Sequence, residues 1–379
     1  GNTGKSAVAA ASSTSASETS NEAGKGSKVS QPAENMDAQV AEASLPQPGE
    51  AISASLTWKS RMELAYATQF AVDTYEDADG MQYEAVSVAD GSRFLLIPEG
   101  GKVPEDLPDS IQVLKRPVKQ IYLVATATMD MFRMLGALPD IRFSGTDASG
   151  WYIPEAKEAM ENGSILYAGK YSEPDYETLV DGDCDLAIES TMILHTPKVQ
   201  EMIEDLGIPV FVDYSSYESH PLGRTEWIKL YGALLNKEEE ADTFFDQQAH
   251  VIEELKGFEN TEKTVAYFYV STDGSIVVRK SDDYIPSMIE IAGGRYAFKD
   301  LKNPDSNAPS VKLTMEEFYA TAVAADYLIY NGTIDGQINS ISEWEAKKEL
   351  FSELKWVKDG NLVYWKELIS GNRYSRRAD

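Results

Sequence analysis

Residues 214–255 carry the pattern that decides the fold, and they read YSSYESHPLGRTEWIKLYGALLNKEEEADTFFDQQAHVIEEL. Apolar residues recur in this stretch at helical spacing. They are Trp227, Ile228, Leu230, Leu234, Leu235, Phe244, Phe245, Val251 and Leu255. The spacing predicts one helix of roughly eight turns, and Pro221 and Gly223 mark where the chain turns into it. A helix of this length is typical of a spine that joins two lobes.

Short apolar runs alternate with helical segments on both sides of this stretch. Such alternation is typical of parallel sheets that helices cover on both faces. We therefore predict an α/β fold of two lobes joined by one long spine helix. The predicted domains are a tether at 1–47, an N-terminal lobe at 48–220, the connecting helix at 221–257 and a C-terminal lobe at 258–379. The last lobe should end with a helix from Ser340 and a strand at 362–365.

The N-terminal region differs in composition from the rest. Its first 47 residues are rich in Ser, Ala, Gly, Thr and Glu and have almost nothing to bury, which predicts a disordered tether. The sequence contains no apolar signal segment and no apolar span of about twenty residues, so we expect any export signal to have been removed. The opening Gly1-Asn2 is similar to the residues that follow a lipid-modified cysteine.

The lobe after the tether begins with a different pattern. From Leu56 to Leu114 the apolar residues have a period near two, with turn residues at 77–80 and 90–91. This pattern predicts a small antiparallel β meander ahead of the α/β part.

The charge balance excludes one class of partner. The 379 residues include 62 acidic and 34 basic side chains, a formal net charge of −28. A nucleic acid would be repelled rather than bound. Cys184 is the only cysteine, which excludes a disulfide framework and a cysteine-based metal site and favours a buried apolar role for this residue.

Four runs of the sequence together resemble one known family. They are PVKQIYLVATATMDMFRMLGALPDIRFSGT (117–146), GKYSEPDYETLVDGDCDLAIES (169–190), GIPVFVDYSS (207–216) and KLTMEEFYATAVAADYLIY (312–330). The chain is similar here to the iron-complex and cobalamin substrate-binding proteins of ABC importers. This resemblance implies two Rossmann-like lobes with a rigid helical connection, a ligand held in the cleft between them and delivery to a membrane permease. Members of that family normally close with a further helix, whereas this chain ends in the polar and basic KELISGNRYSRRAD.

Candidate ligand residues follow the predicted strands. Ligands of open α/β sheets bind where strands give way to helices, and aromatic walls with a few cations suit a bulky, partly anionic chelate. The candidates are Trp151, Tyr152, Lys170, Tyr171, Met192, Tyr214 and His220. For any one of these aromatic residues, packing at the rim of the cleft is the alternative.

Arg224 and Arg279 are the strongest ligand candidates. Arginine binds carboxylate or catecholate oxygens through two parallel hydrogen bonds. The alternative for both is an ion pair with one of the surplus acids. Direct metal binding would have to use His195 and His220, which lack the spacing of a local zinc motif. The sequence shows no nucleophile elbow, and we find no catalytic set.

Two acids are candidates for contacts with a permease. Glu177 and Glu316 lie on the first turns of predicted helices, one in each lobe. Acids at such positions are stabilised by the helix dipole, which is the plainer explanation. The resemblance implies that they pair with arginines of the permease. Glu317, three residues after Thr314, fits a capping box instead.

The function expected from the sequence is that of a binding protein rather than an enzyme. It would be a monomer, lipid-anchored outside the cytoplasm, that captures a ferric siderophore or related iron chelate and delivers it to an ABC permease. Cobalamin and haem stay open as alternative ligands, because both suit an aromatic cleft with cations. An enzyme on a similar two-lobe scaffold is the alternative of another class. No resident cofactor and no protein-bound metal are expected.

Overall fold

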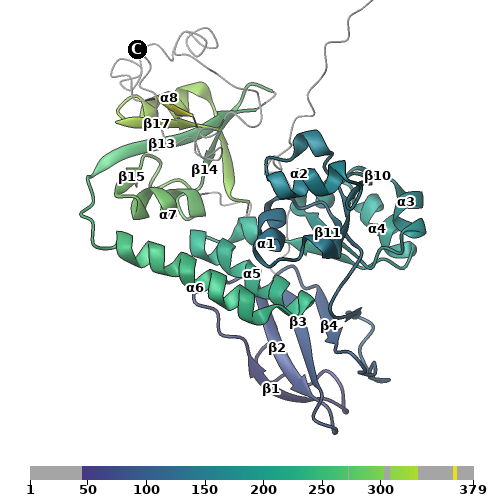
Figure 1. Cartoon of the computed structure of the whole chain (residues 1–379). Helices are drawn as coiled ribbons and strands as arrows, with labels where there is room; N and C mark the ends of the chain where they lie inside the picture. Colours follow the sequence, from purple (N-terminus) through teal and green to yellow (C-terminus); the bar gives the residue numbers. More distant parts are fainter. Residues whose placement is uncertain (1–44, 272, 303–307, 332–361, 365–379) are drawn as a thin grey trace, which may run out of the picture.

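The structure is a computed structural model that describes residues 45–271, 273–302, 308–331 and 362–364 (Figure 1). These residues form a mixed α/β fold. In Figure 1 the helices α5 and α6 lie near the centre, with an N-terminal sheet and two α/β units around them. Most of the predicted tether, the predicted helix from Ser340 and the polar end of the chain lie outside the described residues.

Five strands near the N-terminus form a sheet in the order β1-β2-β3-β4-β5. They are β1 (Thr57–Arg61), β2 (Phe70–Glu76), β3 (Gln82–Val88), β4 (Arg93–Ile97) and β5 (Ile111–Lys115). The first four pair antiparallel, whereas β5 departs from the predicted meander because it runs parallel to β4. Alternate residues face opposite sides, so Phe70 and Leu96 enter the main core while Tyr75 and Leu95 enter a smaller one.

The first α/β unit contains a parallel sheet in the order β12-β11-β6-β7-β8, which confirms the parallel sheet predicted for this part of the chain. Its strands are β6 (Ile121–Leu123), β7 (Ile141–Ser144), β8 (Leu166–Tyr167), β11 (Leu186–Ser190) and β12 (Val210–Asp213). Its helices are α1 (Met129–Met134), α2 (Pro154–Glu161), α3 (Tyr176–Asp181) and α4 (Pro197–Asp205). A short hairpin of β9 (Gly169–Lys170) and β10 (Glu173–Pro174) lies ahead of α3.

The predicted spine is two helices, α5 (Pro221–Leu235) and α6 (Glu238–Leu255), so the single long helix was wrong. Asn236 ends α5 in the left-handed conformation, at φ 55° and ψ 46°, which a continuing helix cannot accommodate. The two helices then pack closely: a Cβ placed on Gly232 would lie 2.8 Å from the Cβ of Ala241. Most of α5 is buried, whereas α6 buries only Ala241 and Phe245 fully.

The second α/β unit has a mixed sheet rather than the predicted parallel one. Its described strands are β13 (Lys263–Val270), β14 (Ile276–Arg279), β15 (Gly294–Tyr296), β16 (Ser310–Leu313), β17 (Tyr327–Tyr330) and β18 (Leu362–Tyr364). The sequence analysis missed β14 and β16, which pair antiparallel beside β13. Strands β17 and β18 run parallel to β13 as predicted. The helices are α7 (Tyr284–Ile291) and α8 (Met315–Ala322), and α8 has the predicted capping box of Thr314 and Glu317.

Two buried carboxylates attach the N-terminal sheet to the start of α5. Glu226, on α5, accepts hydrogen bonds of 2.8 Å from the backbone N–H groups of residues 65–67, in the loop between β1 and β2. Glu218, just before α5, accepts the N–H groups of Thr68 and Gln69 at 2.8 and 2.9 Å. Trp227 donates its indole N–H to the same Glu218 carboxylate at 2.9 Å. These hydrogen bonds to buried carboxylates therefore hold the loop firmly against the start of α5.

The break between α5 and α6 gives a stability prediction. Because Asn236 is left-handed, Asn236→Ala should lower the free energy of unfolding by about 1 kcal/mol, whereas Asn236→Gly should stay within about 0.5 kcal/mol of the parent. Urea unfolding followed by circular dichroism measures both. Equal stability of the Ala and Gly variants would contradict the left-handed helix end.

Candidate ligand-binding site

The loops that leave the first parallel sheet carry most of the predicted ligand residues. Short 3-10 helices follow β6, β7, β11 and β12, at Thr126–Thr128, Ala148–Gly150, Thr191–His195 and Ser215–Tyr217. Because these strands are parallel, their carboxyl ends meet at one edge of the sheet, where ligands of such folds bind. This edge carries Trp151, Tyr152, Met192 and Tyr214, and the β9–β10 hairpin carries Lys170 and Tyr171.

Two of these predicted residues belong to the core. Trp151 is 8% exposed, and its indole N–H lies 3.2 Å from the Ser144 hydroxyl and 3.3 Å from the Thr146 carbonyl. Tyr214 is 2% exposed and packs edge-on against Tyr217 at 5.3 Å, and burial raises the pKa of its phenol. Both rings form the floor of this edge and present little surface to a ligand.

The other predicted residues of this edge are more accessible. Tyr152 is 63% exposed. Lys170 is exposed and forms an ion pair with Glu173 at 3.0 Å, which raises the pKa of the lysine. Tyr171 and Met192 are half-buried. A ligand at this edge would meet these four side chains before the buried rings.

His220 caps the N-terminus of α5. Its Nδ1 accepts the backbone N–H of Leu222 at 3.0 Å, and its ring stacks on Tyr66 with centroids 4.4 Å apart. Burial, and the nearby positive charge of Lys256, lower the pKa of the imidazole. The neutral ring therefore keeps an acceptor for the first turn of α5 at neutral pH.

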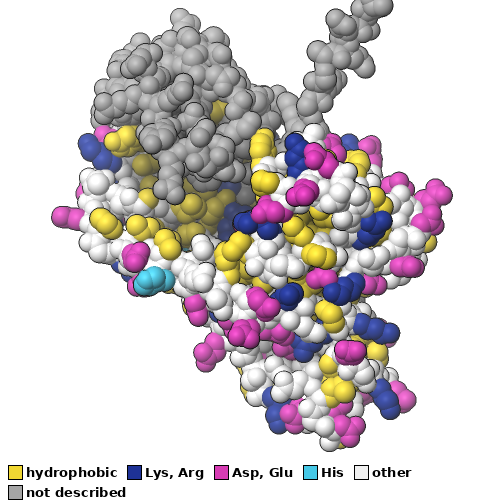
Figure 2. Space-filling view, in the orientation of Figure 1, with side chains coloured by type: hydrophobic (Ala, Val, Ile, Leu, Met, Phe, Trp, Pro, Cys, Tyr) yellow, Lys and Arg dark blue, Asp and Glu magenta, His cyan; other side chains and the backbone are white. Residues whose placement is uncertain are grey.

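The two candidate arginines meet at one tyrosine. Arg224 lies on α5 with its guanidinium carbon 4.0 Å from the centre of the Tyr284 ring, and Arg279 ends β14 with the same carbon 5.4 Å from that centre. Tyr284 begins α7, so the contact joins the first turn of α5 to the second α/β unit. Cations over an aromatic face are attracted by its quadrupole, more strongly when water is excluded. Figure 2 shows Lys and Arg side chains gathered where the two units meet.

Asp283 adds a buried carboxyl group to this cluster. Its carboxylate lies 3.7 Å from Arg279 and accepts the N–H of Ile285 at 3.2 Å, which caps α7. Burial raises the pKa of Asp283, and Arg279 opposes this rise. Asp283 and Tyr284 were missed in the sequence, although both follow Arg279 within five positions.

Glu189 is a third residue that the sequence analysis missed. It lies on β11 with no exposed surface, and neither carboxylate oxygen has a hydrogen-bond partner among the described residues. Burial raises its pKa to about 8. Its charge would affect Tyr122 of β6 and Tyr176 of α3, so the carboxyl lies near both phenols. Glu189 is therefore mostly protonated at neutral pH, and it lies three residues before Met192 in the sequence.

The two predicted docking acids are exposed on opposite units. Glu177 lies on the first turn of α3 and Glu316 on the first turn of α8. In Figure 1, α3 lies at the right side of the first unit and α8 in the upper part of the second unit.

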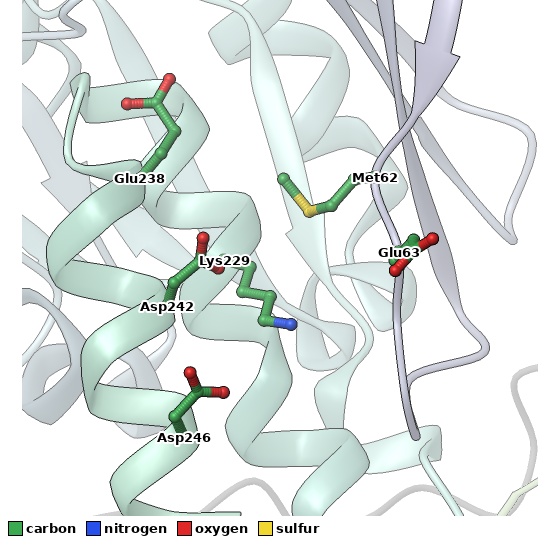
Figure 3. A pocket seen from close by; sticks show the side chains of 6 residues that line it. All are labelled: Met62, Glu63, Lys229, Glu238, Asp242 and Asp246. Carbon is green, nitrogen blue, oxygen red and sulfur yellow. The ribbon is translucent and has the colours of Figure 1, made fainter.

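A pocket of about 340 Å³ lies elsewhere, between the N-terminal sheet and α6 (Figure 3). Its lining consists of Met62, Glu63, Lys229, Glu238, Asp242 and Asp246. Lys229 forms an ion pair with Glu226 at 3.0 Å and lies 4.4 Å from the Phe245 ring centre. The pocket contains none of the predicted ligand residues, and its acids make it unsuitable for an anionic chelate.

Metal-binding and membrane-spanning features were also sought in the described ranges. Within them, no group of three or more His, Cys, Asp or Glu residues is placed to hold a metal ion. None of the described helices combines the length and the apolar character needed to cross a membrane.

Comparison with known proteins identifies the fold and its relatives. The family model described as periplasmic binding protein matches residues 123–368. An uncharacterized lipoprotein, MJ0878 of Methanocaldococcus jannaschii, is 24% identical over 339 residues, covering 83% of this chain and 78% of that protein.

Two solved structures show the same fold at low sequence identity. The periplasmic heme-binding protein HutB of Vibrio cholerae aligns with a TM-score of 0.52 and 15% identity, over 68% of this chain and 94% of its own. The triscatecholate siderophore-binding protein FeuA of Bacillus subtilis, complexed with ferri-bacillibactin, aligns with a TM-score of 0.51 and 15% identity. This alignment covers 66% of this chain and 84% of FeuA.

Glu189 gives a prediction about stability and pH. The pKa of a free glutamate is 4.5 and that of Glu189 is about 8, so between these values the folded state holds a proton that the unfolded state has lost. The free energy of unfolding should therefore fall by about 1.4 kcal/mol per pH unit as the pH rises through this window. Glu189→Gln should remove this slope, as measured by urea unfolding from pH 5 to 7.5.

The matched control is Glu239→Gln, which changes an exposed carboxyl on α6. It should keep the slope of the parent protein. A Glu189→Gln profile parallel to that of the parent would show that Glu189 is already ionised at pH 5.

Proposed function

The chain belongs to the periplasmic binding protein family, and we propose that it captures a ferric siderophore or a related iron chelate between its two α/β units and delivers it to an ABC permease. Members of this family are solute-binding carriers of ABC transporters rather than enzymes. The specific ligand is the part of the proposal that rests on the candidate site.

The observation that carries the proposal is the meeting of Arg224 and Arg279 at Tyr284. Three dianionic catecholates around Fe³⁺ give an anionic complex with oxygen atoms on its surface. Two guanidinium groups can bind such oxygens through charge-assisted hydrogen bonds, and the tyrosine face holds the guanidinium planes in place. Arg224 is half-buried whereas Arg279 is 6% exposed, so Arg224 is the better placed of the two to reach a ligand.

Haem and cobalamin are the alternative ligands. Haem carries two carboxylates and would also meet the arginines, and the fold is shared with the periplasmic heme-binding protein HutB of Vibrio cholerae. Cobalamin carries less negative charge and would depend more on Tyr152 and Tyr171 than on the arginines. Native mass spectrometry of the protein equilibrated with ferric tris-catecholate, haem and cobalamin separates the three. Retention of none of them would contradict the proposal and reopen the enzyme alternative.

The place of action is outside the cytoplasm. The family is extracytoplasmic, and the archaeal relative is named as a lipoprotein. A lipid anchor ahead of the N-terminal region would keep the loaded protein close to its permease. The protein would act as a monomer, with Glu177 and Glu316 as its contacts to arginines of the permease.

The first functional prediction concerns Arg224. Arg224→Ala should weaken binding of ferric tris-catecholate by about 2 to 4 kcal/mol, because it removes a charge partner from a partly desolvated site. Arg295→Ala is the matched control, since Arg295 is an exposed arginine of the second unit that pairs with Glu262 and Glu290. Fluorescence titration measures both variants. Equal affinities of the two variants would remove Arg224 from the site.

The second functional prediction concerns Glu177 and Glu316. Changing both to Gln should leave the free energy of unfolding within about 1 kcal/mol and ligand affinity unchanged, because exposed charges at helix ends contribute little to stability. Uptake by a reconstituted importer should fall, and each single variant should be milder than the double one.

The control for this experiment is Glu155→Gln with Glu239→Gln, which removes two acids from the first turns of α2 and α6. This pair should transport normally. Normal uptake by the Glu177/Glu316 double variant would leave these acids with a helix-terminal role only, and lost ligand affinity would place them in the cleft.

A further inference from the structure

The N-terminal sheet lies outside the family match, which begins at residue 123, yet its β1–β2 loop reaches the start of α5. We propose that this loop, residues 65–69, together with the carboxylates of Glu218 and Glu226, positions Arg224 for the ligand. This inference rests on the proposed function of Arg224. It assigns a role in ligand recognition to a part of the chain that the family model does not cover.

Residues 65–69 of the loop are hydrogen-bonded to α5 and to the residue Glu218 just before it. Every backbone N–H from residue 65 to residue 69 donates to Glu226 or Glu218, at distances of 2.8 to 3.1 Å. The Thr68 hydroxyl adds a bond of 3.0 Å to Glu218. Glu226 has no exposed surface and Glu218 has 1%, so these charge-assisted bonds are shielded from water.

The same loop packs against the turn of α5 that carries Arg224. Gly223 precedes Arg224, and a Cβ at this glycine would lie 3.2 Å from the Tyr66 carbonyl oxygen and 3.2 Å from the Glu218 carboxylate. The Tyr66 ring stacks on His220, the cap of this turn, at an angle of 25°. Loop backbone and loop side chain therefore both fix the first turn of α5 from the side of the N-terminal sheet.

Across the same turn, Arg224 extends to Tyr284 of the second unit, 4.0 Å from the ring centre. Glu226 is only two residues further along α5. A shift of the first turn relative to the rest of α5 would move the guanidinium away from the ring. Binding groups that are held in place before the ligand arrives lose less freedom on binding.

The chain offers a matched control at the other end of α5. Arg116, after β5, lies 2.9 Å from Glu84 of β3 and 2.9 Å from Glu238 of α6, and its guanidinium is 3.4 Å from the Ala233 carbonyl. This cluster also attaches the N-terminal sheet to the helices, but Ala233 lies about 14 Å along α5 from Arg224. Glu84→Gln should therefore destabilise the same interface without moving Arg224.

The first experiment needs no ligand. The Nε–H signal of Arg224, assigned by its loss in Arg224→Lys, should carry a ring-current shift from Tyr284 in ¹⁵N-edited spectra. Glu226→Gln should reduce this shift, because the amide of glutamine would present N–H donors to the loop N–H groups. Glu84→Gln should lower the melting temperature but keep the shift. An unchanged Arg224 signal in Glu226→Gln would overturn the inference.

The second experiment measures affinity for ferric tris-catecholate in a double-mutant cycle. Glu226→Gln should weaken binding at least tenfold in the parent protein but cause little further loss in an Arg224→Ala background. An equal loss in both backgrounds would overturn the positioning role. A parent protein that does not bind the complex counts against the proposed function, and the Arg224 signal still decides the positioning.

A milder variant protects the experiment against misfolding. Gly223→Ala adds only a methyl group that must displace the loop or Glu218 by a few tenths of an ångström. It should reduce the Arg224 ring-current shift in the same direction as Glu226→Gln. A folded Gly223→Ala protein with the parent spectrum would contradict the inference.

Discussion

The burial of α5 is the constraint on which the rest of the structure depends. Trp227 of this helix packs against Phe70 of the N-terminal sheet and Phe211 of the parallel sheet, with ring centroids 5.1 and 6.3 Å apart. Tyr231, one turn later, contacts Phe132 and donates its hydroxyl to Asp213. Arg224 extends in the other direction to the second unit. One helix thus contacts three neighbouring parts of the protein at once, and it carries the buried carboxylate of Glu226 as well as apolar side chains.

The sequence pattern was sufficient to predict those parts of the fold that depend on neighbouring residues in the chain. The parallel sheet of the first unit was predictable because its strands are short apolar runs with prolines at the following helix starts. The break at Asn236 was not predicted, although its signal is present: an Asn is followed by Lys237 and three glutamates that suit a new helix N-terminus. The apolar spacing continues across the break because α6 folds back onto α5, so periodicity alone could not reveal it. Strands β14 and β16 have only four residues each, and it is the pairing of β14 with β13 and of β16 with β14 that identifies them.

Some residues of the candidate site could likewise be predicted from the sequence, and others could not. Arg224 and Arg279 could be chosen from their chemistry and from their positions near predicted strand and helix ends, and the fold brings both to Tyr284. Asp283 and Tyr284 lie at the start of α7, and their place in the site depends on Arg224, which is about 60 positions earlier in the sequence. Glu189, Glu218 and Glu226 could not be recognised, since a buried acid looks like any surface acid in a chain with 62 of them. Whether a carboxylate is buried depends on which donors other segments bring to it, and sequence pattern does not contain that information.

The charge of the protein sets a condition on how an anionic chelate could bind. With a formal net charge of −28, the chain repels anions at long range and cannot steer such a ligand electrostatically. That repulsion is screened beyond a Debye length of about 8 Å at physiological salt, whereas partly buried charges at contact distance are screened much less. Recognition must then come from guanidinium groups fixed at the contact surface rather than from the field of the whole molecule. Under that condition a misplaced Arg224 cannot be compensated by other charges, and a rigid support for the first turn of α5 becomes part of the recognition itself.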